Sequence, residues 1–306
     1  MSVPVLILVT RPVVGEPAGS SGSPGRPSES TDARPAPFVQ ADPTLPHLSV
    51  LDLGVTRGDG EFETVMVSQG AAPAIDAHLD RFAASARLLD LPEPDRAVWR
   101  AAFDAAVAAH PPVELLAVKL VLTRGIEGKD TPTGWIVAQP GRDFSRERVE
   151  GVRVVTLDRG YRHDVATTSP WLLQGAKTLS YAVNTAAIRE AKRRGADDVI
   201  FTSSDGFVLE APTASVLLRE GDRFVTPSAE LGILPGTTQR RAFALLEELG
   251  YETGAKRLRS SELGRADALW LVSSIRRAVP VVELDGVAKC VDRELTARLN
   301  EYLGEH

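Results

Sequence analysis

Apolar residues recur along the chain at two spacings, and these spacings divide it into strands and helices. Order is expected to resume at residues 47–52, and a glycine turn followed by an alternating strand is expected at 57–67. Alternating or continuous apolar runs predict further strands at residues 3–10, 115–124, 135–139, 152–157, 213–218, 223–226, 268–272 and 279–284, with a hairpin at 199–210. Apolar residues three or four apart predict helices near residues 75–89, 94–110, 179–191, 238–249 and 292–303. Strands and helices that alternate in this way favour an α/β (α+β) fold.

The chain is long enough for two domains, and its composition indicates where they divide. It has 306 residues, of which 43% are hydrophobic, so it can bury a sizeable core. A Pro-Gly-Arg-Asp run begins at Pro140, and we expect an N-terminal domain of residues 1–139, a linker at 140–147 and a C-terminal domain of residues 148–306. Residues 11–46 are rich in Gly, Ser and Pro and lack apolar periodicity, which predicts a flexible insertion; a functional lid is the alternative.

Charge and cysteine content argue against several classes of function. The formal net charge of -6 and the pI near 5.5 argue against a nucleic-acid partner. Cys290 is the only cysteine, so no intramolecular disulfide can form and a reducing compartment is favoured. The apolar start at 3–10 is too short to span a membrane. We therefore expect a cytoplasmic protein without a membrane or nucleic-acid partner, and no metal site.

A lone lysine, Lys177, lies in a loop just before the predicted helix at 179–191. Taken alone, such a lysine is typical of a solvated surface. The hairpin at 199–210 changes this interpretation, because it turns at Asp205-Gly206 and brings Glu210 to the end of an apolar strand. A carboxylate buried there needs a cationic partner.

A second stretch, at residues 231–239, strengthens the functional interpretation of Lys177. Gly236, Thr237 and Thr238 stand at a predicted helix start, where free backbone N–H groups, two hydroxyls and the helix dipole favour a phosphate. A lysine for a Schiff base, a carboxylate for a pyridinium nitrogen and a phosphate site are together what pyridoxal 5'-phosphate (PLP) requires.

Other positions each allow a structural and a functional interpretation. Gly58-Asp59-Gly60 is typical of a tight turn, and Arg81 is either a solvated helix residue or a ligand for a phosphate. Lys119 interrupts the apolar run at 115–124, either as an exposed charge or as a cation aimed at a substrate carboxylate. Ser274 follows a strand, where it either forms a turn or donates a hydroxyl to the same phosphate as Thr237.

Several of these motifs, in this order, resemble the fold-type IV PLP enzymes of the class IV aminotransferase family, which include branched-chain and D-amino-acid transaminases and aminodeoxychorismate lyase. The resemblance covers nearly the whole chain apart from residues 11–46, and it rests on Gly58-Asp59-Gly60-x-Phe62-Glu63-Thr64, His78-Leu79-x-Arg81, Lys177, Glu210 and Leu234-Pro235-Gly236-Thr237-Thr238. It implies two α/β domains with the cofactor between them, and a homodimer whose site lies near the interface.

The resemblance also implies roles for individual residues. Lys177 would be the Schiff-base lysine and would move protons, and Glu210 would pair with the pyridinium nitrogen. The phosphate would be held by a further set: Arg81, Gly236, Thr237, Thr238 and Ser274.

Within the family, the lysine-bearing strand at 118–125 and the run Lys177-Thr178-Leu179-Ser180 most resemble aminodeoxychorismate lyase. That enzyme converts 4-amino-4-deoxychorismate to p-aminobenzoate and pyruvate in folate biosynthesis, and Thr64 would assist proton delivery. The substrate has two carboxylates, for which Lys119, Arg124 and Arg276 are cationic candidates.

Two departures from the family pattern leave the substrate open. Ser215 stands where many relatives have asparagine, and Gln239 replaces a common arginine. A D-amino-acid or branched-chain transaminase would use the same Lys177, Glu210 and phosphate site, and is the alternative. A non-catalytic PLP-binding protein is disfavoured because the lysine and both anchoring elements are intact.

Overall fold

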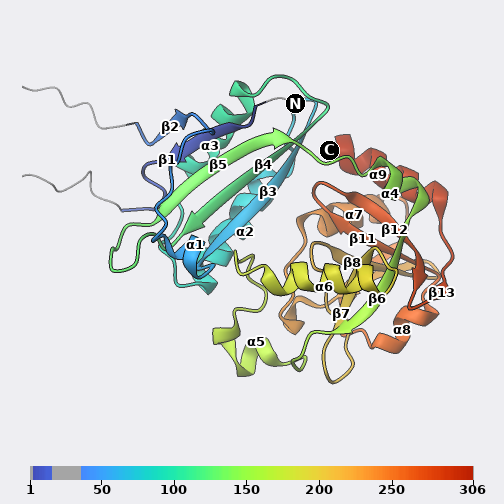
Figure 1. Ribbon diagram of the computed structural model, residues 1–306. Coiled ribbons are helices and arrows are strands. Elements are labelled where there is room, and N and C mark those ends of the chain that lie inside the picture. Colours follow the sequence, from blue (N-terminus) through green and yellow to red (C-terminus); the bar gives the residue numbers. More distant parts are fainter. Residues whose placement is uncertain (1–2, 16–35, 306) are drawn as a thin grey trace, which may run out of the picture.

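Two β-sheets organise the protein in the computed structural model, which describes residues 3–15 and 36–305 (Figure 1). The mixed α/β class expected from the sequence is confirmed. The strands are β1 Val5–Val9, β2 Phe38–Ala41, β3 Gly60–Ser68, β4 Leu115–Thr123, β5 Thr133–Pro140, β6 Val152–Asp158, β7 Asp198–Thr202, β8 Ser215–Glu220, β9 Arg223–Pro227, β10 Glu252–Lys256, β11 Ala268–Ser273, β12 Arg277–Leu284 and β13 Val287–Ala288. The helices are α1 Leu53–Thr56, α2 Ile75–Leu88, α3 Arg96–Ala109, α4 Ser145–Glu150, α5 Val165–Thr168, α6 Ala182–Arg193, α7 Thr237–Glu248, α8 Ser260–Arg265 and α9 Arg293–Glu305, with 3-10 helices η1 Pro170–Leu172 and η2 Ala229–Leu231.

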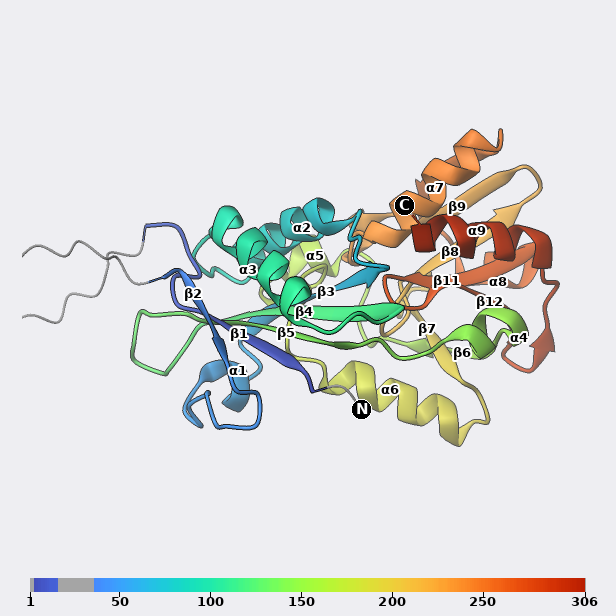
Figure 2. The same cartoon turned by 90° about the horizontal axis from the view of Figure 1, so that it is seen from above.

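The first sheet is antiparallel, in the order β2-β1-β5-β4-β3, and α2 and α3 cover one of its faces (Figure 2). Alternation along β4 behaves as predicted: Leu116, Val118 and Leu120 are buried under the helices, while Lys119 is exposed on the other face. Phe82 and Trp99 join the two helices edge to face at 4.9 Å. This core holds β3, and with it the residues of the predicted glycine motif, against α2.

The prediction of a flexible insertion at residues 11–46 is wrong at both of its ends, and residues 16–35 lie outside the described part. Strand β2 pairs with β1, and Val13 is 5% exposed and bridged to Pro94. The indole N–H of Trp99 donates to the carbonyl of Pro12 at 2.7 Å. These partners lie elsewhere in the chain, so the local composition did not indicate them.

Two predicted boundaries shift for identifiable reasons, and the segment where order was expected to resume precedes a short helix. Residues 47–52 lead into α1, which Asp52 caps by accepting from the N–H of Gly54 at 2.8 Å. Helix α3 begins at Arg96 rather than Pro94, since the Asp95 carboxylate caps it. Helix α6 begins at Ala182, because residue Leu179 is used for pairing with Gly60.

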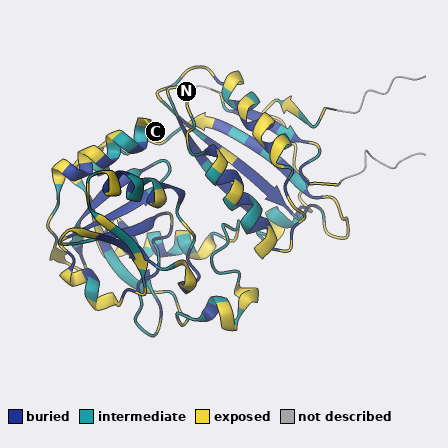
Figure 3. Ribbon diagram, turned by 180° about the vertical axis from the view of Figure 1, so that it is seen from behind, coloured by how far each residue is buried: buried dark blue, intermediate teal, exposed yellow. Residues whose placement is uncertain are grey.

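The second sheet has eight strands in the path β10-β9-β8-β11-β12-β6-β7, with β13 paired to β12. Pairs at its two ends are parallel and those in the middle are antiparallel. Helices α7 and α9 pack on β11 around Trp270, whose indole donates to the hydroxyl of Thr296 at 2.8 Å. Figure 3 shows the strands of both sheets as buried and the outer helix faces as exposed.

Between the sheets the chain passes from Pro140, the last residue of β5, through α4 into β6. No described strand of the first sheet follows β5, and none of the second precedes β6. We keep the division into residues 1–139 and 148–306 as a proposal on that basis. No helix in the described part of the chain is both long and apolar enough to cross a membrane.

The edge of β3 joins the first sheet to the loop that carries Lys177. The N–H of Phe62 donates to the carbonyl of Lys177 at 3.0 Å, and the N–H of Leu179 donates to the carbonyl of Gly60 at 2.8 Å. Two glycines permit this approach: a Cβ at Gly58, whose φ is +69°, would lie 2.9 Å from Oγ of Ser180, and a Cβ at Gly60 would lie 2.9 Å from Cδ1 of Leu179. The glycine motif is thus both a turn and the surface on which the lysine loop rests.

Candidate active site

Lys177 is fixed through its backbone, which leaves its side chain free. Its N–H donates to the hydroxyl of Ser85 on α2 at 3.1 Å, and its Nζ lies 4.6 Å from the ring centroid of Phe62. No hydrogen bond of Nζ is present among the described residues. Burial lowers the pKa of the Lys177 ammonium to about 8, with the nearby cations Arg81 and Lys119 adding to the effect. More of this lysine is therefore the nucleophilic free amine near neutral pH than of an ordinary exposed lysine.

Glu210 follows the predicted turn and lies within electrostatic reach of Lys177. Strand β7 ends at Thr202, Gly206 turns the chain at φ +86°, and the N–H of Phe201 donates to the carbonyl of Glu210 at 2.9 Å. The carboxylate oxygen Oε2 accepts from the N–H of Leu234 at 3.2 Å. Burial raises the pKa of the Glu210 carboxyl to about 7, against the opposing effects of that hydrogen bond and the Lys177 cation. A cationic partner would therefore stabilise the ionised form of the Glu210 carboxyl.

The predicted phosphate site lies at the start of α7, and we call Gly236, Thr237 and Thr238 there the cup. Gly236 is the N-cap of α7 and makes no side-chain hydrogen bond to the helix, while the first two helical residues, Thr237 and Thr238, are buried. A Cβ at Gly236 would lie 2.3 Å from Oγ of Ser215, so the chain there requires glycine. The arrangement leaves unsatisfied backbone N–H groups at the positive end of a helix dipole.

Arg81 stands beside this cup and is held there by Glu63 of β3. Its Nε and Nη2 donate to Glu63 at 2.7 and 2.8 Å, and its Nη1 donates to the carbonyl of Pro235 at 3.1 Å. The same carboxylate lies 2.7 Å from Nδ1 of His78. Burial alone would raise the pKa of Glu63, but the guanidinium of Arg81 and the imidazole of His78 more than offset it and lower the pKa to about 2. Glu63 is therefore a permanent anion that orients both α2 side chains.

Thr64 and Lys119 lie opposite each other on neighbouring strands, on the sheet face that Phe62 shares. Nζ of Lys119 lies 5.1 Å from the ring centroid of Phe62. No ion pair of Lys119 is present among the described residues. Ser274 also reaches this strand, because its hydroxyl accepts from the N–H of Met66 at 3.1 Å. The structure thus brings Lys119 and Lys177 over one aromatic ring, with Thr64 paired opposite Lys119 on the neighbouring strand.

Arg124 and Arg276 are engaged elsewhere, and we withdraw both as substrate contacts. Arg124 makes four hydrogen bonds, two of them to the carboxylate of Asp59 at 2.7 and 3.2 Å. Arg276 is 8% exposed and forms a buried ion pair with Asp198. Each partner acid lies far away in the sequence, so the runs around the arginines gave no sign that their charges are neutralised.

The structure adds residues to which sequence reasoning assigned no role. Glu63 and His78 were present in the matched motifs but were not interpreted. Tyr181 stacks edge to face on Phe62 at 5.5 Å, and its hydroxyl donates to the carbonyl of Pro212 at 2.6 Å. Burial raises the pKa of its phenol to about 12. The sequence feature that could have indicated a place for Tyr181 in the site is its position four residues after Lys177, just before a helix.

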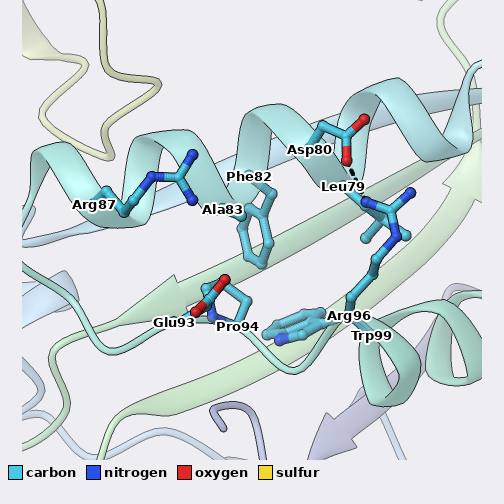
Figure 4. A pocket seen from close by; sticks show the side chains of 9 residues that line it. All are labelled: Leu79, Asp80, Phe82, Ala83, Arg87, Glu93, Pro94, Arg96 and Trp99. Carbon is cyan, nitrogen blue, oxygen red and sulfur yellow. Dashed lines mark hydrogen bonds and ion pairs between the residues drawn. The ribbon is translucent and has the colours of Figure 1, made fainter.

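A cavity of about 440 Å³ between α2 and the start of α3 lies apart from this cluster (Figure 4). None of its lining residues belongs to the candidate active site. They are Leu79, Asp80, Phe82, Ala83, Arg87, Glu93, Pro94, Arg96 and Trp99. Asp80 and Arg96 form an ion pair at its rim. In the described part of the chain, no group of three or more His, Cys, Asp or Glu residues could hold a metal ion.

Comparisons with known proteins match most of the chain. Residues 60–284 match the family model described as amino-transferase class IV. A bifunctional aminodeoxychorismate lyase / D-amino acid transaminase from Mycobacterium tuberculosis is 42% identical over 255 residues, which cover 80% of this chain and 88% of that protein.

Two solved structures are similar along most of their length. A fold IV-transaminase from Curtobacterium pusillum has a TM-score of 0.90 and 52% identity, covering 98% of this chain and 97% of that one. A hypothetical aminotransferase from Mycobacterium tuberculosis in a PLP-bound form has a TM-score of 0.83 and 40% identity, covering 87% and 96%.

Proposed function

Because this chain belongs to the class IV aminotransferase family, whose members are PLP-dependent, we propose that it is an aminodeoxychorismate lyase. In that reaction 4-amino-4-deoxychorismate yields p-aminobenzoate and pyruvate. The observation that carries the choice of substrate is Lys119: an exposed ammonium without a carboxylate partner in the described structure, on the face that holds Thr64. A substrate with two carboxylates suits such a cation.

The residues of the site fit PLP. The N-cap Gly236 leaves the start of α7 without a side-chain cap, so its first backbone N–H groups are available to a phosphate. Nζ of Lys177 and Oε1 of Glu210 have no hydrogen-bond partner among the described residues. In the proposal Lys177 bonds the aldehyde carbon and Glu210 faces the ring nitrogen. The phosphate contacts come from Arg81, Gly236, Thr237, Thr238 and the hydroxyl hydrogen of Ser274.

When bound, PLP supplies an electron sink for the substrate carbon next to the amine. The Lys177 amine, with a pKa near 8, is basic enough to take the proton from that carbon. Lys119 orients a substrate carboxylate. The hydroxyl of Thr64 delivers a proton to the departing enolpyruvate as the carbon–oxygen bond breaks. One proton thus leaves the ring carbon and one reaches the product methyl group, so no oxo acid is consumed.

Amino-group transfer between a D-amino acid and a 2-oxo acid is the second candidate. The specific observation in its favour is that the 42% identical relative carries both names, and the 52% identical structure is a transaminase. Lys177, Glu210 and the cup serve this reaction equally well, since both reactions begin with proton removal next to the amine.

The decisive experiment mixes the PLP-loaded protein with 4-amino-4-deoxychorismate, without an oxo acid, and follows p-aminobenzoate by fluorescence. We expect product, with a raised KM in Lys119→Met and an unchanged one in Lys192→Met, an exposed lysine on α6. Absence of product, together with transfer from D-alanine to 2-oxoglutarate, would replace the lyase by the transaminase.

We extend the proposal to a homodimer, in keeping with the family, and to a cytoplasmic location, in keeping with a single cysteine. Large apolar side chains lie exposed before and within α1, with Val50 at 80%, Leu51 at 62% and Val55 at 59% exposure. Light scattering on the purified protein tests the dimer directly.

A further inference from the structure

A buried chain of hydrogen-bonding groups runs from the cup at the start of α7 into the first sheet. Oγ1 of Thr237 lies 3.3 Å from Nε2 of His78, and Nδ1 of the same imidazole lies 2.7 Å from Glu63. Thr237, His78 and Glu63 are 4%, 1% and 0% exposed, so water does not compete for these contacts. The ring of His78 therefore connects the first hydroxyl of the cup to a buried carboxylate.

The Glu63 end of this chain fixes one proton of the imidazole. Arg81 and His78 keep the pKa of Glu63 at about 2, so its carboxylate only accepts hydrogen bonds. Nδ1 of His78 must then carry a hydrogen and donate it to Glu63. The state of the imidazole is consequently decided at Nε2, the atom that faces Thr237.

The two states of Nε2 give Thr237 opposite polarities toward the cup. If Nε2 is bare, it accepts the hydroxyl hydrogen of Thr237, and only oxygen lone pairs remain for a ligand. If Nε2 carries a proton, it donates to Oγ1, and the hydroxyl hydrogen is released to point at the ligand. An anion in the cup favours the second state, because it needs hydrogen-bond donors and is attracted to the imidazolium.

Charged groups face His78 from each element packed around it. Burial lowers the pKa of His78, the carboxylate of Glu63 on β3 raises it, and Arg81 on its own helix and Lys177 in the loop lower it. Glu61 lies beside Glu63 on β3 but adds no charge near pH 7.5, because burial and the charge of Glu63 raise its pKa to about 9. The positive end of the α7 dipole adds to the cations. With the cup free of anions, the imidazole is therefore neutral near pH 7.5. A dianion in the cup would add negative charge beside Nε2 and would favour the protonated imidazole.

We propose that the anion site at the start of α7 is proton-linked: a phosphate dianion binds there together with one proton, which His78 takes up on Nε2 to turn Thr237 into a donor. His78 is a positioning residue in this proposal, since it acts on the ligand through Thr237. The inference rests on the proposed function only in that the cup receives the phosphate group of PLP.

The test reads the imidazole directly. The chain has five histidines, so long-range ¹H–¹⁵N NMR of protein labelled with ¹⁵N-histidine gives the tautomer and charge of each. Three samples at pH 7.5 suffice: apo-protein, apo-protein with sodium sulfate, which stays a dianion at this pH, and the PLP-loaded protein. His78→Asn identifies the signal. We expect neutral His78 with Nδ1–H in the apo-protein, and a doubly protonated ring in the sulfate and PLP samples.

Two matched variants separate proton linkage from simple loss of binding. Thr237→Val removes the hydroxyl that accepts from Nε2, so we expect His78 to remain neutral when PLP is bound. Thr238→Val removes the neighbouring buried hydroxyl, which does not contact His78, so the doubly protonated signal should persist. Thr237→Ser keeps a hydroxyl at this position, so the doubly protonated signal that Thr237→Val loses should be present in this variant.

A neutral His78 in the PLP-loaded protein would overturn the proposal while leaving the cofactor site intact. Failure of the protein to retain PLP would instead overturn the proposed function. If sulfate proves too weak to occupy the cup, the PLP-loaded sample decides alone.

Discussion

Lys119 and Lys177 come from distant parts of the chain, yet both place their ammonium groups over the ring of Phe62, at 5.1 and 4.6 Å from its centroid. Two like charges this close disfavour each other, and Lys119 is one of the groups that lower the pKa of Lys177. A residue proposed to bind substrate thus also prepares the residue proposed to react with the cofactor.

Removing the charge at Lys119 should therefore raise the pKa of Lys177. The rate at which apo-protein takes up PLP should rise with pH as Lys177 loses its proton, so its midpoint follows the pKa of Lys177, which is about 8 in the parent protein. In Lys119→Met we expect this midpoint at a higher pH. Absorbance of the PLP adduct measures that rate. Lys192→Met, which removes a distant exposed lysine, should leave the midpoint in place. An unchanged midpoint in Lys119→Met would show that the two charges do not interact.

Lys177→Ala should abolish turnover without unfolding the protein. The contacts that hold position 177 are made by its backbone, to Ser85 and Phe62, and the substitution keeps them. Loss of both nucleophile and base should reduce kcat by about 10³-fold or more. Lys177→Arg keeps a cation but not the chemistry, and should be equally inactive. Circular dichroism checks the fold, and activity in either variant would disprove the role of the lysine.

Glu210→Gln should weaken catalysis more than stability. The amide keeps an acceptor for the N–H of Leu234, so the local fold has its hydrogen bond, but it cannot pair with a cationic ring nitrogen. We expect kcat to fall by about 10²-fold, comparable to losing an electrostatic contact at the reacting centre. Steady-state kinetics and the melting temperature measure both quantities. A variant with full activity would mean that Glu210 does not face the ring.

Gly236→Ala should disturb the cup through one identifiable clash. The new Cβ would lie 2.3 Å from Oγ of Ser215, with Cβ of Gln239 next at 3.1 Å. We expect a cost of about 1–3 kcal/mol, seen as weaker PLP retention and a lower melting temperature. The double variant Gly236→Ala/Ser215→Ala removes the closest atom and should recover part of the loss. Equal defects in the single and double variants would place the cause elsewhere.

Glu61 should make the protein less stable as the pH rises. Its carboxyl oxygens are buried and have no hydrogen-bond partner among residues 3–15 and 36–305, and burial, with the neighbouring charge of Glu63, raises its pKa to about 9. The folded state then holds a proton that the unfolded state releases above pH 4.5, so the free energy of unfolding falls between pH 4.5 and 9. The slope from this group is at most about 1.4 kcal/mol per pH unit.

Glu61→Met should remove that slope and raise stability by about 1–3 kcal/mol, because an apolar side chain of similar length needs no partner. Urea unfolding at several pH values measures the effect. Glu301→Met, at an exposed position of α9, controls for a general change in charge. If both variants keep the parental slope, Glu61 is not the group that titrates.

The sequence by itself determined what depends on neighbouring positions along the chain. Alternation placed Lys119 on the face of β4 opposite Val118 and Leu120, and helical spacing found α2, α7 and α9. The helix-start run marked the cup, and the turn at Asp205-Gly206 led to Glu210, because a glycine or a capping position constrains the backbone within a few residues.

Only the tertiary structure decided which charged groups meet. Arg124 and Asp59 lie 65 positions apart in the sequence. The separation is 78 positions for the pair of Arg276 with Asp198 and 159 positions for that of Thr237 with His78. Whether an arginine is free, or a carboxyl such as Glu61 is left without a partner, depends on those encounters. A residue's local pattern sets its conformation, but its charge state and availability follow from desolvation and from the groups that the fold brings against it.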